Sequence, residues 1–220
     1  MEDVPAAVRS LITAAVADEL ATTYDDQVVF PRHVVIDLHE DPDRRFPEWP
    51  TPVLVIAVEN QGVCSWGVPL DDPALPVVVG DSGGTIVYTP DVASYLAARR
   101  WDRRCVHRGP LLQAQAAELD DDSLARLRAD FDEQPATHGW PGHTQFRFER
   151  DGVMILLWSD AGQCDWWLSG PADALSVAVG RLLSLSDLST SLWSNDAAGE
   201  ALLVGLRKSL EDPANQGDQP

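Results

Sequence analysis

Two stretches with the same plan constrain the fold of this chain more than any other feature. Residues 53–70 (VLVIAVENQGVCSWGVPL) and residues 153–170 (VMILLWSDAGQCDWWLSG) each contain an apolar run, a turn ending in glycine, and a run with cysteine and tryptophan. A shift of the sequence by 100 positions without gaps aligns identical residues at Val53, Gly62, Cys64, Trp66, Ala74 and Leu75. Both stretches predict β-hairpins, related either by duplication or by the general preference of Val and Trp for strands.

The turn residues support the two hairpins. Asn60 and Asp160 stand at the start of the turns, and Gly62 and Gly162 supply the positive φ that a three-residue hairpin loop with a bulge requires. The apolar run before each turn is nearly continuous, which is typical of a strand buried on both faces. We therefore expect an antiparallel sheet built from the two hairpins and flanked by helices, an α+β fold with the option of two pseudo-repeated halves.

The remaining pattern supplies the other elements. Helical periodicity and capping signals predict helices at residues 5–21, 89–100 (with Thr89 as the cap), 111–119, 124–131, 172–183, 185–193 and 199–210. Short β-forming runs predict further strands at residues 27–30, 34–38, 76–79, 85–88 and 143–150. The segment QPATHGWPG, residues 134–142, is the best internal linker.

The linker predicts where the chain divides into two halves. Residues 1–140 form an N-terminal α+β half, and residues 141–210 form a C-terminal β-meander with helices that packs with the first half as one compact unit. The polar residues 211–220 are expected to be an unstructured tail.

Length and cysteine usage indicate a globular protein of the cytoplasm. A chain of 220 residues buries a sizeable core, and its three cysteines include no CxxC pair and are odd in number, as expected for reduced thiols. The first residues, MEDVPAAVRS, lack the basic and apolar regions of a signal peptide. No apolar run approaches the roughly 20 residues that span a bilayer.

The net charge is the most informative bulk property. The chain has 35 acidic and 16 basic residues, a formal net charge of −19. Such a surface repels nucleic-acid phosphates and anionic lipid and attracts basic proteins. It also serves solubility in general.

The chain shows no motif for catalysis, a cofactor or a metal. The P-loop, GxGxxG and HExxH are all missing from the sequence. His138 and His143 end the turn HGWPGH, but no cysteine or carboxylate stands near them in sequence. We expect no catalytic residues, no cofactor and no metal site.

Two charged runs have both a functional and a structural interpretation. The basic run of residues 99–108 (RRWDRRCVHR) has a composition suited to single-stranded nucleic acid, and the end of a helix explains it equally. The acidic run of residues 118–133 does not match an EF-hand, and it suits either a solvated helix face or a docking surface. Because the chain is so acidic, we favour the structural interpretation of the basic run.

The tryptophans on the predicted hairpins point to binding. Adjacent Trp166 and Trp167 must face opposite sides of a strand, so one is buried and the other is exposed or covered by a helix. Tryptophan is enriched at interface hot spots, which makes this pair a candidate anchor for a partner.

The first hairpin resembles a known family. The combination of ENQG at residues 59–62, WGVPL at residues 66–70, DP at residues 72–73 and VVV at residues 77–79 resembles the hairpin of the SUKH superfamily, the SMI/KNR-like proteins. The resemblance covers roughly residues 50–100. The LP dipeptide and Gly-containing turn of the family's N-terminal signature are not clear here, and the half after residue 110 lies outside the resemblance except through its hairpin.

The resemblance implies an α+β fold and, in bacteria, an immunity protein that neutralises a toxin, often a nuclease, by binding it. We therefore predict a protein-binding module without catalytic activity that occludes a basic partner. Glu59, Asp71 and Asp72 beside the first hairpin are the predicted charge contacts, with Trp166 or Trp167 as anchor. A self-associating scaffold and an enzyme without a recognisable motif remain the alternatives. Neither the toxin nor the oligomeric state follows from the sequence.

Overall fold

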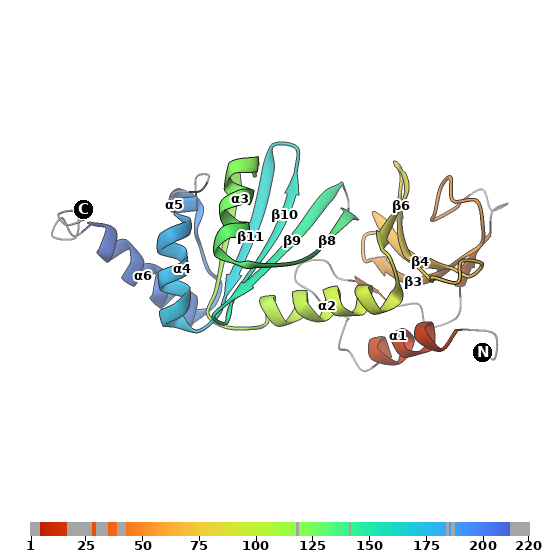
Figure 1. Cartoon of the computed structure of the whole chain (residues 1–220), viewed down its shortest axis with the longest axis horizontal. Helices are drawn as coiled ribbons and strands as arrows, with labels where there is room; N and C mark the ends of the chain where they lie inside the picture. Colours follow the sequence, from red (N-terminus) through yellow and green to blue (C-terminus); the bar gives the residue numbers. More distant parts are fainter. Residues whose placement is uncertain are drawn as a thin grey trace. The chain divides into compact units, whose positions relative to one another are not determined.

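The computed structural model describes residues 5–16, 28–29, 35–38, 43–117, 119–140, 142–183, 185 and 188–211. The helices in these ranges are α1 (Ala6–Val16), α2 (Val92–Val106), α3 (Asp121–Asp130), α4 (Ala172–Leu182), α5 (Leu188–Ser191) and α6 (Ala197–Glu211) (Figure 1). The strands are β1 (Val28–Val29), β2 (Val35–Asp37), β3 (Val53–Glu59), β4 (Cys64–Pro69), β5 (Val77–Asp81), β6 (Gly84–Thr89), β7 (Leu111–Ala117), β8 (Asp132–Trp140), β9 (His143–Arg150), β10 (Val153–Asp160) and β11 (Gln163–Ser169). The fold is α+β, as predicted.

The described strands form two antiparallel sheets instead of the single sheet predicted. The first sheet has the order β1-β3-β4-β5-β6, with β2 also pairing with β3. The second has the order β7-β11-β10-β9-β8. The predicted hairpins are β3–β4 and β10–β11, so each hairpin belongs to its own sheet.

The chain divides into two compact units. One contains residues 1–103 and 137–144, and the other contains residues 104–136 and 145–220. Three elements, α2, β8 and β9, contribute residues to both units.

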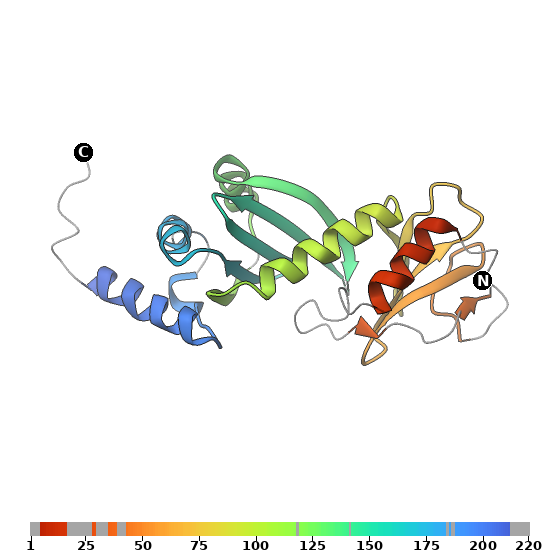
Figure 2. The ribbon, with the colours of Figure 1, turned by 90° about the horizontal axis from the view of Figure 1, so that it is seen from below.

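The first unit packs α1 and the start of α2 on one face of its sheet (Figure 2). Trp66 lies at the centre of this core, with its ring centroid 6.1 Å from that of Tyr88. On the opposite face, Phe46 packs on Val53, Val55 and Val78. Both faces of β3 and β4 are therefore covered, as their continuous apolar runs predicted.

The second unit packs α3, α4, α5 and α6 against one face of its sheet. Trp166 is the largest side chain of that core, and its neighbours include Leu127 of α3 and Leu175 of α4. The opposite face is also buried and carries Met154, Leu156 and Trp167.

The two hairpins have the same register near their turns. Ala57 pairs with Trp66 in the first hairpin, and Leu157 pairs with Trp166 in the second, which preserves the shift of 100 positions. A bulge between Val55 and Ala57 then displaces the first hairpin by one residue, while the second continues without a shift.

The predicted helix at residues 111–119 is wrong, since residues Leu111–Ala117 form β7. Leu, Ala and Gln favour a helix locally. The segment also has a period of two, because Leu112, Ala114 and Ala116 are all buried in the core. Pairing with β11 along its whole length decides in favour of the strand.

Other predicted boundaries also change. Residues 134–140 of the predicted linker form most of β8. Helix α2 continues to Val106 instead of ending at residue 100, and Asp91 replaces Thr89 as its cap, since the Ser94 N–H donates to Asp91 Oδ1 at 2.7 Å. The predicted helix at residues 185–193 shortens to α5.

Some predictions fall outside the described residues. Among these are residues 17–21 of the first predicted helix and residues 212–220 of the predicted tail. Residue 211, predicted as the first of the tail, is instead the last residue of α6.

Candidate functional site

Glu59 does not present its charge to a partner. The residue ends β3 and is buried, and its Oε2 accepts hydrogen bonds from the N–H groups of Gln61 at 2.7 Å and Val63 at 3.3 Å. The Gly62 N–H donates to the Glu59 carbonyl at 2.9 Å. This carboxylate organises the β3–β4 turn, and the structure corrects its predicted role as an exposed contact.

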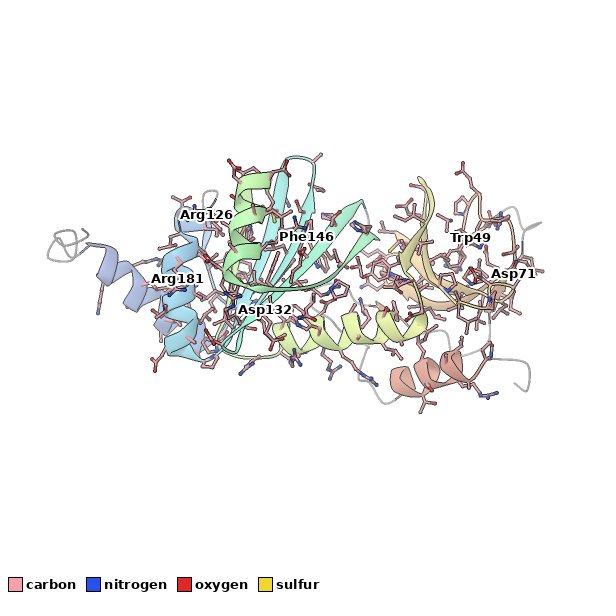
Figure 3. All side chains as sticks on the ribbon, in the orientation of Figure 1. Trp49, Asp71, Arg126, Asp132, Phe146 and Arg181 are labelled. Carbon is pink, nitrogen blue, oxygen red and sulfur yellow. The ribbon has the colours of Figure 1, made fainter. Side chains whose placement is uncertain are left out.

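Asp71 and Asp72 lie in the β4–β5 loop, as the position of the turn predicted. Asp71 is exposed, and its Oδ1 accepts a hydrogen bond from the Thr51 hydroxyl at 2.8 Å (Figure 3). Asp72 is half-buried, and its Oδ1 accepts from the Ala74 N–H at 2.8 Å. Each carboxylate thus has one oxygen bonded within the chain. Of the three carboxylates predicted to contact a partner, Asp71 and Asp72 are therefore the two that solvent reaches.

Trp166 and Trp167, the predicted anchor, are both buried in the structure. Trp166 is 1% exposed and Trp167 is 6% exposed. The two side chains do face opposite sides of β11. Trp166 points into the helix-covered core, and the Trp167 ring packs edge-on against Trp158, with centroids 4.9 Å apart. Both rings are thus covered within the chain, which is one of the two environments predicted for the second tryptophan, and the role of the pair as an anchor stays a prediction.

The basic run of residues 99–108 lies on α2 and the turn after it. Arg99 is buried, with its guanidinium carbon 5.7 Å from the centroid of the Trp66 ring, the arrangement of a cation–π contact. Arg104 forms an ion pair with Glu149 at 2.7 Å. These contacts support the structural interpretation of the run, although four of its five arginines lie within the helix and only Arg108 follows its end.

The acidic run contributes both a cap and paired charges. Asp120 caps α3, with its Oδ1 accepting from the Ser123 N–H at 2.6 Å, and this bond lowers the pKa of the Asp120 carboxyl. Arg128 pairs with Glu133 at 2.8 Å, and Arg150 pairs with Asp132 at 3.3 Å. Figure 3 marks Asp132 on this part of the second unit. Asp121 and Asp122 in the first turn of α3 are exposed.

The three thiols are all buried and form no disulfide. Burial raises the pKa of the Cys164 thiol to about 12, and the neighbouring Asp165 carboxylate acts in the same direction. A nucleophilic cysteine needs a lowered pKa, so Cys164 has the opposite environment. Within the described residues, no three His, Cys, Asp or Glu side chains are grouped so as to bind a metal ion. None of the helices described has the length and apolar character needed to cross a bilayer.

One accessible feature did not emerge from sequence reasoning. Strand β6 lies at the end of the first sheet, and its Ile86 and Val87 are 46% and 49% exposed. The sequence predicted a strand here, but its place at the edge depends on the pairing order of the whole sheet. The signal that could have indicated it is the absence of any charged residue in GTIVYT.

No family model, curated protein or solved structure matches the chain. The resemblance to the SUKH superfamily therefore depends on the hairpin residues alone.

Proposed function

We propose that this chain is a protein-binding module without catalytic activity, an immunity-type protein that neutralises a basic, nuclease-type toxin by occluding it. The observation that carries this proposal is the surplus of carboxylates in both compact units. The first unit has 17 acidic and 7 basic residues, a net of −10, and the second has 18 acidic and 9 basic residues, a net of −9. The negative charge is therefore a property of the whole chain and not of one tail.

The environment of the basic residues supports the same conclusion. Arg104, Arg128 and Arg150 form ion pairs with carboxylates of their own unit. Arg99 and Arg147 are buried. The surplus carboxylates, among them Asp71, then set the sign of the surface potential.

The mechanism is electrostatic steering followed by occlusion. A negative field of this size accelerates encounter with a positively charged partner by one or more orders of magnitude at low salt. A nuclease binds its substrate through a basic cleft, because phosphate neutralisation dominates its affinity. An acidic protein seated on that cleft excludes the substrate without any chemical step.

The test is co-expression with the protein encoded by the neighbouring reading frame. We expect co-expression to restore growth of cells that this neighbour inhibits, and the purified pair to bind with an association rate that falls steeply with salt. A failure to restore growth contradicts the immunity role. An association rate that is unchanged between low and high salt contradicts steering.

A matched pair of variants locates the charge contact. Asp71→Asn with Asp72→Asn removes two charges while retaining oxygen acceptors for Thr51 and the Ala74 N–H. Asp173→Asn with Glu200→Gln removes two exposed charges from the other unit. We expect the first variant to slow association more than the second, and an equal effect would show that only the total charge matters.

A further inference from the structure

Strand β6 forms an open edge of the first sheet. It pairs with β5 on one side, and no other strand of the described residues pairs with its outer side. Proteins protect such edges with charged residues or proline, because an unpaired row of N–H and C=O groups is a template for another strand. The sequence of β6, GTIVYT, contains neither.

The turn before β6 determines which backbone groups face outward. Asp81 and Gly84 pair directly across the two-residue turn. Val79 and Ile86 form the next pair of the same kind, two residues further from the turn. In an antiparallel ladder, alternate residues direct their N–H and C=O groups to the same neighbour. Gly84 and Ile86 therefore bond to β5, and Thr85 and Val87 direct their backbone groups to the outer edge.

The side chains at this edge suit an added strand. Ile86 shares the sheet face of Val79, and Val87 shares the face of Val78, so one apolar side chain is half-exposed on each face. The Thr85 hydroxyl oxygen is buried and has no hydrogen-bond partner within the described residues. Gly139 packs against Ile86 of β6, so closely that a Cβ added to Gly139 would lie 2.5 Å from Ile86 Cδ1.

The charges near the edge are acidic. Asp81 is the partner of Gly84 in the ladder, and a Cβ at Gly84 would lie 3.7 Å from Glu48 Oε2. Asp91 follows the strand, and its pKa is lowered by hydrogen bonds from Ser94, so it is ionised at neutral pH. The nearby cation Arg45 directs its guanidinium to the Ser65 hydroxyl on β4.

We propose that the outer edge of β6 binds an extended segment of a basic protein by strand addition, with Thr85 and Val87 supplying the backbone hydrogen bonds. The segment alternates apolar residues, which meet Ile86 or Val87, with basic residues, which meet Asp81, Glu48 and Asp91. A second copy of this chain would bring a further charge of −19 to the same edge, so the acidic surface disfavours self-pairing. This inference rests on the proposed function and names the surface that carries it.

The probe is a blocked peptide of three Lys-Val repeats, titrated into the full chain and followed by the amide NMR signals of Thr85 and Val87. We expect binding and slower hydrogen exchange of these two amides. Val87→Pro removes the outward N–H without removing a bond to β5, and we expect it to raise the peptide Kd by about tenfold or more. A peptide N-methylated on its pairing edge should lose binding to the unaltered chain, which tests the same bond without any change to the protein.

Val87→Lys and Val177→Lys form a matched control. Both replace an exposed valine with the same charge, one on β6 and one on α4. We expect only the first to weaken peptide binding strongly. Equal weakening by the two variants, equal binding of a Glu-Val peptide, or a dimer that Val87→Pro dissociates would each overturn the proposal.

The natural partner separates this inference from the proposed function. If the neighbour-encoded protein binds Val87→Pro as tightly as the unaltered chain and is still neutralised, the edge proposal fails and the function stands. If the Lys-Val peptide binds at β6 while co-expression does not restore growth, the edge stands and the function fails.

Discussion

The two hairpins share a register near their turns but differ in the residue that follows the central tryptophan. Trp66 and Trp166 occupy the same place relative to their turns. The next residue is Gly67 in the first hairpin and Trp167 in the second. A side chain at Gly67 would collide with Val53 and would lie 2.6 Å from Cζ of Phe46.

This difference shows two ways of covering the second face of a sheet. In the first unit a loop residue, Phe46, lies over a strand that has no side chain at that point. In the second unit the strand supplies its own cover, since Trp167 packs on Trp158. A shared local pattern therefore fixes the hairpin, while the residues that pack on its outer face differ between the two units.

The largest expected effect concerns the central tryptophan, which the two hairpins have in common. Trp66→Ala and Trp166→Ala should each lower the free energy of unfolding by about 3–5 kcal/mol, because each removes the largest side chain of its core. Urea denaturation measures this loss. In hydrogen exchange, protection should fall first in the sheet that carries the substitution. A simultaneous fall in both sheets would show that the two units unfold as one.

The next prediction tests the difference at Gly67. Gly67→Val should cost about 1–3 kcal/mol through overpacking against Phe46. The cost should be smaller in a Phe46→Ala background, and a double-mutant cycle measures the coupling. Gly180→Ala is the control, since open space surrounds that helical glycine, and it should stabilise the chain by about 0.5–1 kcal/mol. Additive costs at Gly67 and Phe46 would contradict the proposed packing.

A smaller effect distinguishes the two turns. Glu59→Ala should cost about 1–2 kcal/mol, because the N–H groups of Gln61 and Val63 lose their acceptor. Ser159→Ala changes the equivalent position of the second hairpin, where a hydroxyl replaces the carboxylate of Glu59, and should cost less. Thermal unfolding of both variants provides the comparison. Equal costs would show that Glu59 contributes nothing special to its turn.

The smallest predicted effect concerns the carboxylate of Asp196 in the second unit. Asp196 caps α6 through the Gly199 N–H and also accepts from the Leu111 N–H of β7, both at 2.8 Å. Burial by itself would raise the pKa of Asp196, but the hydrogen bonds from Gly199, Leu111, Ala198 and Ser194 lower it. Asp196→Ala should therefore cost about 1 kcal/mol at neutral pH.

The pH dependence of that cost has a definite sign. Because the pKa of Asp196 is lower in the folded chain, its contribution is complete above the ordinary Asp pKa near 3.9 and is lost as the pH falls through the folded value. Urea denaturation at pH 7 and at pH 3 should show a smaller difference between the variant and the unaltered chain at the lower pH. A difference that grows on acidification would contradict this role.

Local patterns predicted most of the elements correctly. The turn glycines, the helix that contains Leu124 and the apolar runs of β3 and β10 all depend on residues close in sequence. The candidate site was predicted less well. Asp71 is exposed as expected, whereas Glu59 and the two tryptophans are buried, because their environment depends on residues far away in the chain.

The sequence by itself determined the α+β class, the two hairpins with their common register, and the acidic surface, because backbone periodicity, turn chemistry and charge are local properties. Only the tertiary structure decided that the hairpins belong to two sheets, that residues Leu111–Ala117 form a strand, and that β6 has an open edge. The physical reason is that strand pairing and burial are set by contacts between residues far apart in sequence. Those contacts outweigh the helix propensity of β7, and its pairing with β11 decides the outcome.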